Sequence, residues 1–547
     1  MDRRKFLTGQ ESEINTSGYG FRTFSGLTPY TGAFGKAELV HLLRRTLFGV
    51  TPFNVNSFSN KSLNEVIQQL LLAPAAATAP LNYYNNSTYT DPNVLSGQSW
   101  VTAPYTDGTA NSRRINSFKS WWIGQILNQN ESLLEKMVLF WHNHFATETA
   151  DISDARYIYK HHKLIRTFAL GNFRQFIKEM TIDPGMLRYL NGYLNTKTAP
   201  DENYARELQE LFTLGKGPGS KYVEDDVKAA AKILTGYRLD ANAITYTFDP
   251  TRHDTSTKTF SAFYNNKVIA GKTGVAGLTE LDELLDMIFL QNEVAMYIIR
   301  RLYRFFVYYE IDSATETNVI TPLAEIFRNS NYEIKPVLTA LFSSEHFFDN
   351  LNRGCLIKSP VDFTVGLCRQ FGVLFPDDAD GVNQYLMWEY IRGQSSNLQQ
   401  NLGDPPNVAG WPAYYQEPQF HELWINSDTL PKRSQFSDRM IGTGYTRNGK
   451  KIVIDPIAFI NNLSKPEDPN ILIMDVLDLL YGNPVSQQLK DFLKSILLSG
   501  QSTDFYWTDA WQNYKNAPGN TMTKSIVTTR LQAFFKYLMN LAEYQLS

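Results

Sequence analysis

Two histidines lie two residues apart near the end of an apolar segment, Phe140-Trp141-His142-Asn143-His144-Phe145. Imidazole is a common metal ligand and a common acid–base group. On a helix, residues two apart point about 200° away from each other, so His142 and His144 could not both reach one metal ion. Thr147 and Glu148 indicate that the helix ends nearby, and an extended segment would let the pair chelate. The pair is therefore either a metal site or a structural, hydrogen-bonding element. A nuclease of the H-N-H type is excluded, because that fold spreads its residues over a ββα unit.

A second polar cluster follows in residues 201–212, where a helix is expected. Helical spacing puts Arg206, Glu207 and Glu210 on one side of this helix and the apolar residues on the other. The ordinary interpretation is a solvated face with pairs of opposite charge. The functional interpretation makes Glu207 a carboxylate ligand or general base and Arg206 a group that holds an anion.

A third cluster is the adjacent pair His253 and Asp254 in the polar stretch 249–256. Residues 244–248 alternate in polarity, so we expect a strand there that pairs with residues 257–260 across a long hairpin tip. At such a tip His253 would be an acid–base group oriented by Asp254, or both would be metal ligands. A solvated polar turn is the alternative.

Helices must position these groups, because most of the chain has apolar residues at three-to-four spacing. Caps mark two of the predicted helix starts. Ser62 forms a capping box with Glu65, and Ser359-Pro360 opens another helix. Residues 74–116 lose the helical periodicity, and we expect an insertion loop there before helices resume at Ser117.

The predicted fold class is therefore all-α, with one large multi-helix domain, a small β-hairpin excursion and a C-terminal helical bundle. We expect an extended N-terminal arm over residues 1–36 and the large domain, with its 74–116 loop, over residues 37–442. Asn448-Gly449 predicts a hairpin turn near the start of the last part, residues 443–547, whose helices would form the small bundle.

The composition excludes several classes of protein. With 547 residues, 43% of them hydrophobic and 13% aromatic, the chain is long enough for a large core and lacks the signature of disorder. A formal charge of −3 offers no surplus of basic residues for general nucleic-acid binding. The two cysteines cannot form a disulfide framework or a four-thiolate zinc site.

Cellular location is only partly constrained by the sequence. No apolar run reaches the roughly 18 residues of a membrane span, so no transmembrane segment is predicted. The most apolar candidate, residues 297–309, is interrupted by Arg300, Arg301 and Arg304 and is predicted to be a buried helix with charged ends. Arg3-Arg4 resembles a twin-arginine export signal but lacks the apolar region that should follow it. We therefore predict a protein that is exported or in the cell envelope. A cytoplasmic location is the alternative.

Six motifs contain most of these polar groups. They are His41-Leu42-Leu43-Arg44-Arg45-Thr46-Leu47-Phe48-Gly49; Glu135-Lys136-Met137-Val138-Leu139-Phe140-Trp141-His142-Asn143-His144-Phe145; Glu202-Asn203-Tyr204-Ala205-Arg206-Glu207-Leu208; Phe248-Asp249-Pro250 with His253-Asp254; Lys358-Ser359-Pro360-Val361; and Asp404-Pro405-Pro406-Asn407-Val408-Ala409-Gly410-Trp411-Pro412 with Trp424-Ile425-Asn426-Ser427. Together and in this order, over roughly residues 37–440, they resemble the bacterial family called "domain of unknown function 1800". Its activity is unassigned, so the resemblance transfers no catalytic residue. It does imply gene neighbours of a sulfatase-like family, and export of many members.

Two functions follow as predictions, one enzymatic and one not. The first is a metal-assisted hydrolase that acts on a cell-envelope or extracellular polymer. The six residues that would carry its chemistry are the ligands of a divalent metal, His142, His144 and His253, and the catalytic residues Glu207, Arg206 and Asp254. The alternative is a binding or assembly protein that partners a sulfatase-like protein. The hydrolase requires His142, Glu207 and His253 to converge on a cleft, whereas hydrogen bonds that satisfy each of them would favour the alternative.

Overall fold

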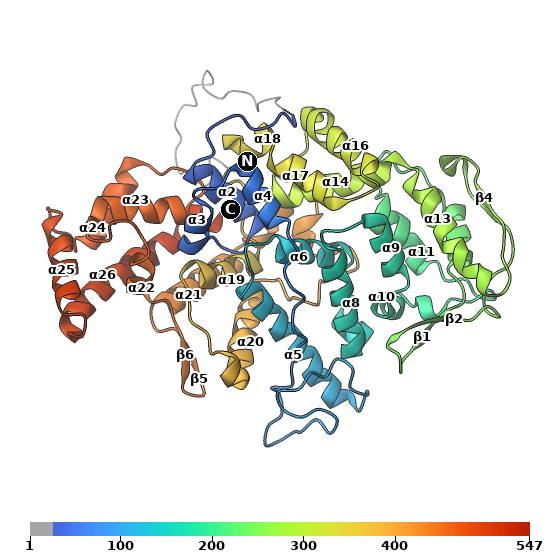
Figure 1. Cartoon of the computed structure of the whole chain (residues 1–547), viewed down its shortest axis with the longest axis horizontal. Helices are drawn as coiled ribbons and strands as arrows, with labels where there is room; N and C mark the ends of the chain where they lie inside the picture. Colours follow the sequence, from blue (N-terminus) through green and yellow to red (C-terminus); the bar gives the residue numbers. More distant parts are fainter. Residues whose placement is uncertain (1–25) are drawn as a thin grey trace.

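The computed structural model describes residues 26–547 and is mainly helical, with only small two-stranded sheets in that part of the chain (Figure 1). This agrees with the predicted fold class. Arg3-Arg4 and most of the predicted arm 1–36 lie outside the described residues.

The helices of the first half are α2 (Lys36–Thr46), α3 (Pro52–Phe58), α4 (Leu63–Leu70), α5 (Gly108–Leu127), α6 (Leu134–His144), α7 (Thr149–Ile152), α8 (Ala155–Phe168), α9 (Phe173–Thr181), α10 (Pro184–Tyr189), α11 (Asn203–Glu207) and α12 (Glu224–Ile233). Those of the second half are α13 (Thr279–Phe289), α14 (Asn292–Phe306), α15 (Ser313–Thr315), α16 (Thr321–Asn329), α17 (Ile334–Phe342), α18 (Glu345–Phe348), α19 (Pro360–Gln370), α20 (Gly381–Asn397), α21 (Thr429–Ile441), α22 (Pro456–Ile460), α23 (Pro469–Leu480), α24 (Gln487–Leu497), α25 (Phe505–Asn516) and α26 (Thr521–Asn540).

The predicted caps are present. Ser62 accepts a hydrogen bond from the backbone N–H of Glu65 at 3.4 Å, and the Glu65 carboxylate accepts from the N–H of Ser62 at 2.8 Å. Ser359 caps α19 by accepting from the N–H of Asp362 at 3.2 Å. These side chains satisfy backbone donors that a helix start leaves unpaired.

The 74–116 loop ends earlier than predicted, because α5 begins at Gly108 and not at Ser117. The polar composition of this stretch does not indicate a helix, but Asp107 caps one. Its carboxylate accepts from the N–H groups of Thr109 at 2.7 Å and Ala110 at 2.9 Å. The first turns of α5 then hold the loop through a buried ion pair, in which Arg114 Nε lies 2.9 Å from Asp91 Oδ2.

The predicted pairing of residues 244–248 with residues 257–260 is wrong. Strand β2 (Thr245–Phe248) instead pairs antiparallel with β1 (Tyr237–Asp240), and β3 (Lys258–Thr259) pairs with β4 (Val268–Ile269). Asp240 closes the first hairpin by accepting from the N–H groups of two following residues. Residues 249–256 therefore connect two hairpins. The predicted turn at Asn448-Gly449 is confirmed, between β5 (Tyr445–Arg447) and β6 (Lys450–Ile452).

Buried apolar side chains form one connected core from Leu39 in α2 to Tyr544 near the end of the chain. In the C-terminal part, red at the left of Figure 1, α26 packs against α21, α22, α24 and α25. The chain end then returns to the middle of the molecule, where Leu546 bridges to Ile357. The division at residue 443 stays a prediction. None of the helices in residues 26–547 has both the length and the apolar character that crossing a membrane requires.

Candidate functional site

Both histidines of the 140–145 motif lie in the last turn of α6, so their side chains point in different directions. His144 Nε2 lies 3.0 Å from the carbonyl oxygen of Phe212, and burial holds the pKa of His144 well below its usual range. Since a carbonyl only accepts, this nitrogen carries the proton and donates. The hydrogen bond ties the end of α6 to the π-helix Leu208–Thr213 and removes this nitrogen as a metal ligand.

His142 packs against two indole rings, with centroid distances of 4.8 Å to Trp122 and 5.6 Å to Trp411. Its Nε2 is buried and has no hydrogen-bond partner in residues 26–547. Burial lowers the pKa of His142 to about 3, so the ring is neutral at physiological pH. Asn143, between the two histidines, accepts a 2.8 Å hydrogen bond from the N–H of Trp411 and so fixes the turn of the last motif.

His253 belongs to a buried charged network. Its Nε2 lies 3.0 Å from Glu280 Oε1, and its Nδ1 lies 3.0 Å from the carbonyl oxygen of Thr235. The second carboxylate oxygen of Glu280 accepts from Lys258 Nζ at 2.7 Å. Asp254 accepts from the N–H of Ser256 at 2.8 Å and thereby shapes the connection between the hairpins. Both ring nitrogens of His253 are therefore occupied, and its contacts are those of a structural residue.

The three predicted metal ligands are not brought together as a metal-binding group. Among the described residues, no set of three or more histidine, cysteine, aspartate or glutamate side chains could hold a metal ion.

Arg206 is held in ion pairs on the outside of α11. Its Nη2 lies 3.0 Å from Glu202 and 2.5 Å from Glu224. Glu207 is half-buried where α11 passes into the π-helix, and one of its carboxylate oxygens has no hydrogen-bond partner in the described part of the chain. Burial, followed by the nearby charge of Glu210, raises the pKa of Glu207 to about 6.

This raised pKa predicts a pH-dependent stability. An acid whose pKa is higher in the folded state than in the unfolded state destabilises the fold once the pH exceeds the unfolded value, here 4.5, and the loss is complete above about 6. Replacement Glu207→Gln should therefore raise the free energy of unfolding at pH 8 relative to pH 5 by about 1 kcal/mol, after discounting for solvent screening. Urea unfolding of the wild type, Glu207→Gln and the exposed control Glu325→Gln at both pH values measures this. An identical pH response in all three proteins would contradict it.

Four of the six motifs meet elsewhere, at a small cavity lined by residues of α2, α6, α14 and α19. These four helices lie in the central part of Figure 1. The cavity has a volume of about 60 Å³. We call it the cation cavity, because five cationic side chains line it: Arg44, Arg45, Lys136, Arg301 and Arg304. The acidic side chain in the lining is Asp362, at the start of α19.

Arg44 and Arg45 are buried in the last turn of α2. Nη2 of Arg44 donates to the carbonyl oxygen of Leu479 at 2.9 Å, and Nη2 of Arg45 donates to that of Asn352 at 2.7 Å. In residues 26–547 the Nε and Nη1 atoms of both side chains lack partners. Burial lowers the pKa of Arg44 to about 9, which leaves it charged at neutral pH.

The other lining cations differ in how they are compensated. Lys136 forms an ion pair with Asp362, which opposes the lowering of its pKa by burial. Arg301 donates to the hydroxyl of Tyr297 at 2.9 Å. Arg304, which is half-exposed, lies 3.5 Å from a carboxylate oxygen of Glu417.

Two further buried cationic side chains, Arg433 and Lys358, lie outside the lining of the cavity. Arg433 Nη2 donates to the carbonyl oxygen of Lys358 at 2.9 Å, and burial lowers the pKa of Arg433 to about 9. Lys358 Nζ lies 4.0 Å from the ring centroid of Tyr544 and donates to the carbonyl oxygen of the same residue at 2.5 Å. Burial and the neighbouring Arg44 hold the pKa of Lys358 well below its usual range.

The sequence does not predict the cation cavity as a functional site. In the sequence, Arg301 and Arg304 only interrupt an apolar run. Arg44, Arg45 and Lys136 occur within the family motifs, but nothing there assigns them a role. The available signal was basic residues on otherwise apolar helices, because such residues are rarely buried without a partner.

The family resemblance is confirmed and is longer than the motifs indicated. The model of the family described as "Protein of unknown function (DUF1800)" matches residues 41–546, and the chain belongs to this family. The C-terminal helices, predicted to lie beyond the family region, are therefore part of it. No curated protein and no solved structure matches the chain.

Proposed function

We propose that the protein is a binding protein for ligands that carry a carboxylate, sulfate or phosphate group, and that this group enters the cation cavity. One observation carries the proposal: five cationic side chains and one acidic side chain line the cavity in a chain whose formal charge is −3.

Desolvation explains why this surplus favours a ligand. A buried charge without a partner destabilises a fold by several kcal/mol, so natural proteins pair such charges or use them. Within the described part of the chain, Arg44 and Arg45 each leave Nε and Nη1 without a partner and meet no carboxylate, so an anion in the cavity would compensate their charge.

The size of the cavity limits what enters it. A volume of about 60 Å³ accommodates a few waters or one small anionic group, not a whole sugar or nucleotide. Arg301, Arg304 and Tyr309 line the cavity and are also partly exposed to solvent. The ligand is therefore either a small anion or a larger molecule that inserts one charged group.

A melting experiment tests the proposal. Sulfate at a hundred times its dissociation constant should stabilise the fold by about 2.7 kcal/mol, which corresponds to a rise in Tm of about 2 °C for a chain of this length. Sodium chloride at matched ionic strength serves as the reference, since sulfate also stabilises proteins non-specifically.

Two variants make the melting experiment specific. Arg301→Gln should lose the sulfate-dependent rise, whereas Arg328→Gln, a half-exposed arginine on α16 outside the cavity, should keep it. The same rise in both variants and the wild type would contradict the proposal. Phosphate and acetate run in parallel rank the three anion chemistries.

Metal-assisted hydrolysis with His142, His144, His253 and Glu207 stays a prediction. Metal analysis of the purified wild type, His142→Ala and His253→Ala tests it, with a stoichiometric metal lost in the variants as the supporting result. Export and a sulfatase-like partner are likewise predictions that rest on the family resemblance, and co-purification from the native cell tests the partner.

A further inference from the structure

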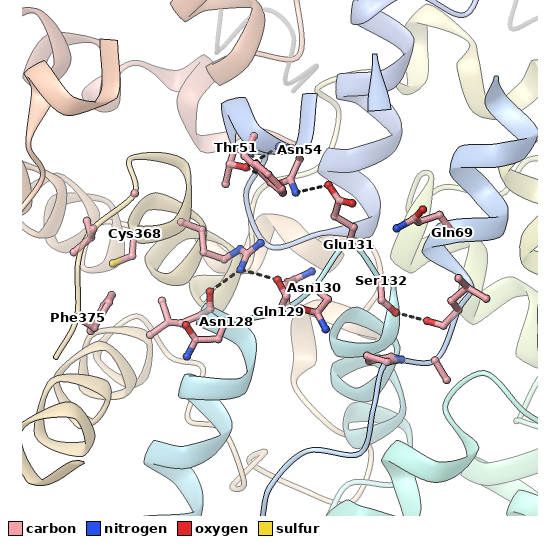
Figure 2. Close-up of a pocket in the computed structure, with 18 residues that line it drawn as sticks. Thr51, Asn54, Gln69, Asn128, Gln129, Asn130, Glu131, Ser132, Cys368 and Phe375 are labelled. Carbon is pink, nitrogen blue, oxygen red and sulfur yellow. Dashed lines mark hydrogen bonds between the residues drawn. The ribbon is translucent and has the colours of Figure 1, made fainter. Parts of the chain in front are cut away.

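A second and larger cavity lies at the C-terminal end of α19, whereas the cation cavity lies at its start, and it has a different chemistry. Its volume is about 700 Å³, and α3, α4, the loop between α5 and α6, and the C-terminal end of α19 enclose it (Figure 2). We call it the amide cavity, because five carboxamide side chains line it: Asn54, Gln69, Asn128, Gln129 and Asn130.

Three of these amides are consecutive, Asn128, Gln129 and Asn130 in the loop that follows α5. Their side-chain amides make no hydrogen bond with another lining residue in Figure 2. The carbonyl group of Gln129 is oriented by the backbone N–H of Phe48, which donates to it at 3.1 Å. The amide nitrogen of Gln129 has no partner in residues 26–547. The exposed amides of Asn128 and Asn130, on either side of Gln129, therefore offer donors and acceptors to a ligand.

Hydrogen bonds fix the polar side chains on the α3 side of the cavity. Asn54 accepts from the N–H of Thr51 at 3.2 Å and donates to Glu131 Oε1 at 3.4 Å. Ser57 donates to the same oxygen at 2.5 Å. This leaves the second oxygen of Glu131 available in a fixed position, and a fixed polar group loses little entropy when it binds a ligand.

The amide cavity has little charge to offer an ion. Arg369, the cation in its lining, donates to the carbonyl oxygens of Leu127 at 2.6 Å and Gln129 at 3.2 Å. The guanidinium is therefore used to hold the loop, and Glu131 is the carboxylate in the lining. Amides on a nearly neutral surface suit a ligand that is itself neutral and both donates and accepts hydrogen bonds.

Apolar side chains complete the cavity. Phe53 is 71% exposed and Leu72 is 62% exposed at its edge, and Phe375 lies on the α19 side. A ligand that covered these side chains would remove their apolar surface from water, which is favourable. An aromatic ring beside amide groups presents an apolar face for C–H groups and hydrogen-bond partners for hydroxyl groups.

We propose that the amide cavity binds a neutral oligosaccharide. Sugar hydroxyls both donate and accept, as the exposed amides of Asn128 and Asn130 require, and the C–H face of a pyranose ring can lie on Phe53. This site is separate from the cation cavity, and its ligand carries no charge, so failure of one proposal leaves the other standing.

Titration with defined neutral oligosaccharides tests the proposal. The probes are hexamers of β-1,4-glucose, α-1,4-glucose, β-1,4-xylose and β-1,4-N-acetylglucosamine, and binding is measured by saturation-transfer NMR and calorimetry on the full chain. We expect at least one hexamer to bind, and Asn128→Ala with Asn130→Ala to weaken it at least tenfold. Asn64→Ala, an exposed amide on α4 outside the cavity, is the matched control and should bind as the wild type does.

Folding does not obscure the result, because Asn128 and Asn130 are both exposed. Absence of binding by every hexamer at millimolar concentration would overturn the proposal. Binding that the double variant leaves unchanged would also overturn it, as would binding of a triglycine probe in place of every sugar, which would assign the cavity to peptides.

Discussion

Replacement Glu280→Gln is expected to destabilise the protein by about 3–5 kcal/mol, because it leaves Lys258 buried without its carboxylate partner. Glu280 also binds His253 at 3.0 Å and accepts from the N–H of Lys272 at 2.7 Å, so one carboxylate joins three segments. Urea unfolding measures the loss. Glu283→Gln, which removes a half-exposed ion pair with Lys272, is the control and should cost under about 1 kcal/mol.

A second variant keeps this prediction testable if Glu280→Gln does not fold. The double variant Glu280→Gln with Lys258→Met removes both charges and should recover part of the lost stability. Unchanged stability of Glu280→Gln would contradict the structural role of the network that holds His253.

Replacement Arg45→Met is expected to abolish the sulfate response without lowering the stability of the free protein. Arg45 forms no ion pair in the described part of the chain, and two of its three guanidinium nitrogens lack partners there. Replacement of buried ion pairs by apolar side chains is often neutral or stabilising, and Arg45→Met leaves no carboxylate unpaired, so we expect the same sign here. Keeping Arg45 for anion binding thus lowers the stability of the ligand-free protein.

Arg353→Met is the matched control for Arg45→Met. Arg353 lies outside the cation cavity and donates to Glu38 at 2.9 Å, so its loss leaves a carboxylate unpaired. We expect this variant to be destabilised and to keep its sulfate response. Urea unfolding with and without sulfate measures both effects. A destabilised Arg45→Met that still responds to sulfate would contradict the account.

Local features of the fold could be predicted, because they depend on residues close in sequence. Ser62 with Glu65, Ser359 before Pro360, and the Asn448-Gly449 turn satisfy or bend the backbone within a few residues. Pairing of β2 could not be predicted in the same way. Its partner, Tyr237–Asp240, competes with residues 257–260, because the loops 241–244 and 249–256 both allow an antiparallel hairpin.

Contacts far apart in sequence limited the prediction of the site. His253 next to Asp254 suggested an acid–base pair, but its actual partners are Glu280 and the carbonyl of Thr235, which the fold supplies. The cation cavity is a stronger case, since Arg44 and Arg301 come together only when α2 and α14 meet at α19. The motifs marked the right segments, and the structure shows which of their side chains share a surface.

A crystal structure of the protein soaked in selenate tests the central claim most directly, because selenium scatters anomalously and selenate has the shape and charge of sulfate. We predict one ordered selenate in the cation cavity, within hydrogen-bond distance of the guanidinium groups of Arg45 and Arg301. Anomalous peaks at other surfaces with none in the cation cavity would contradict the claim.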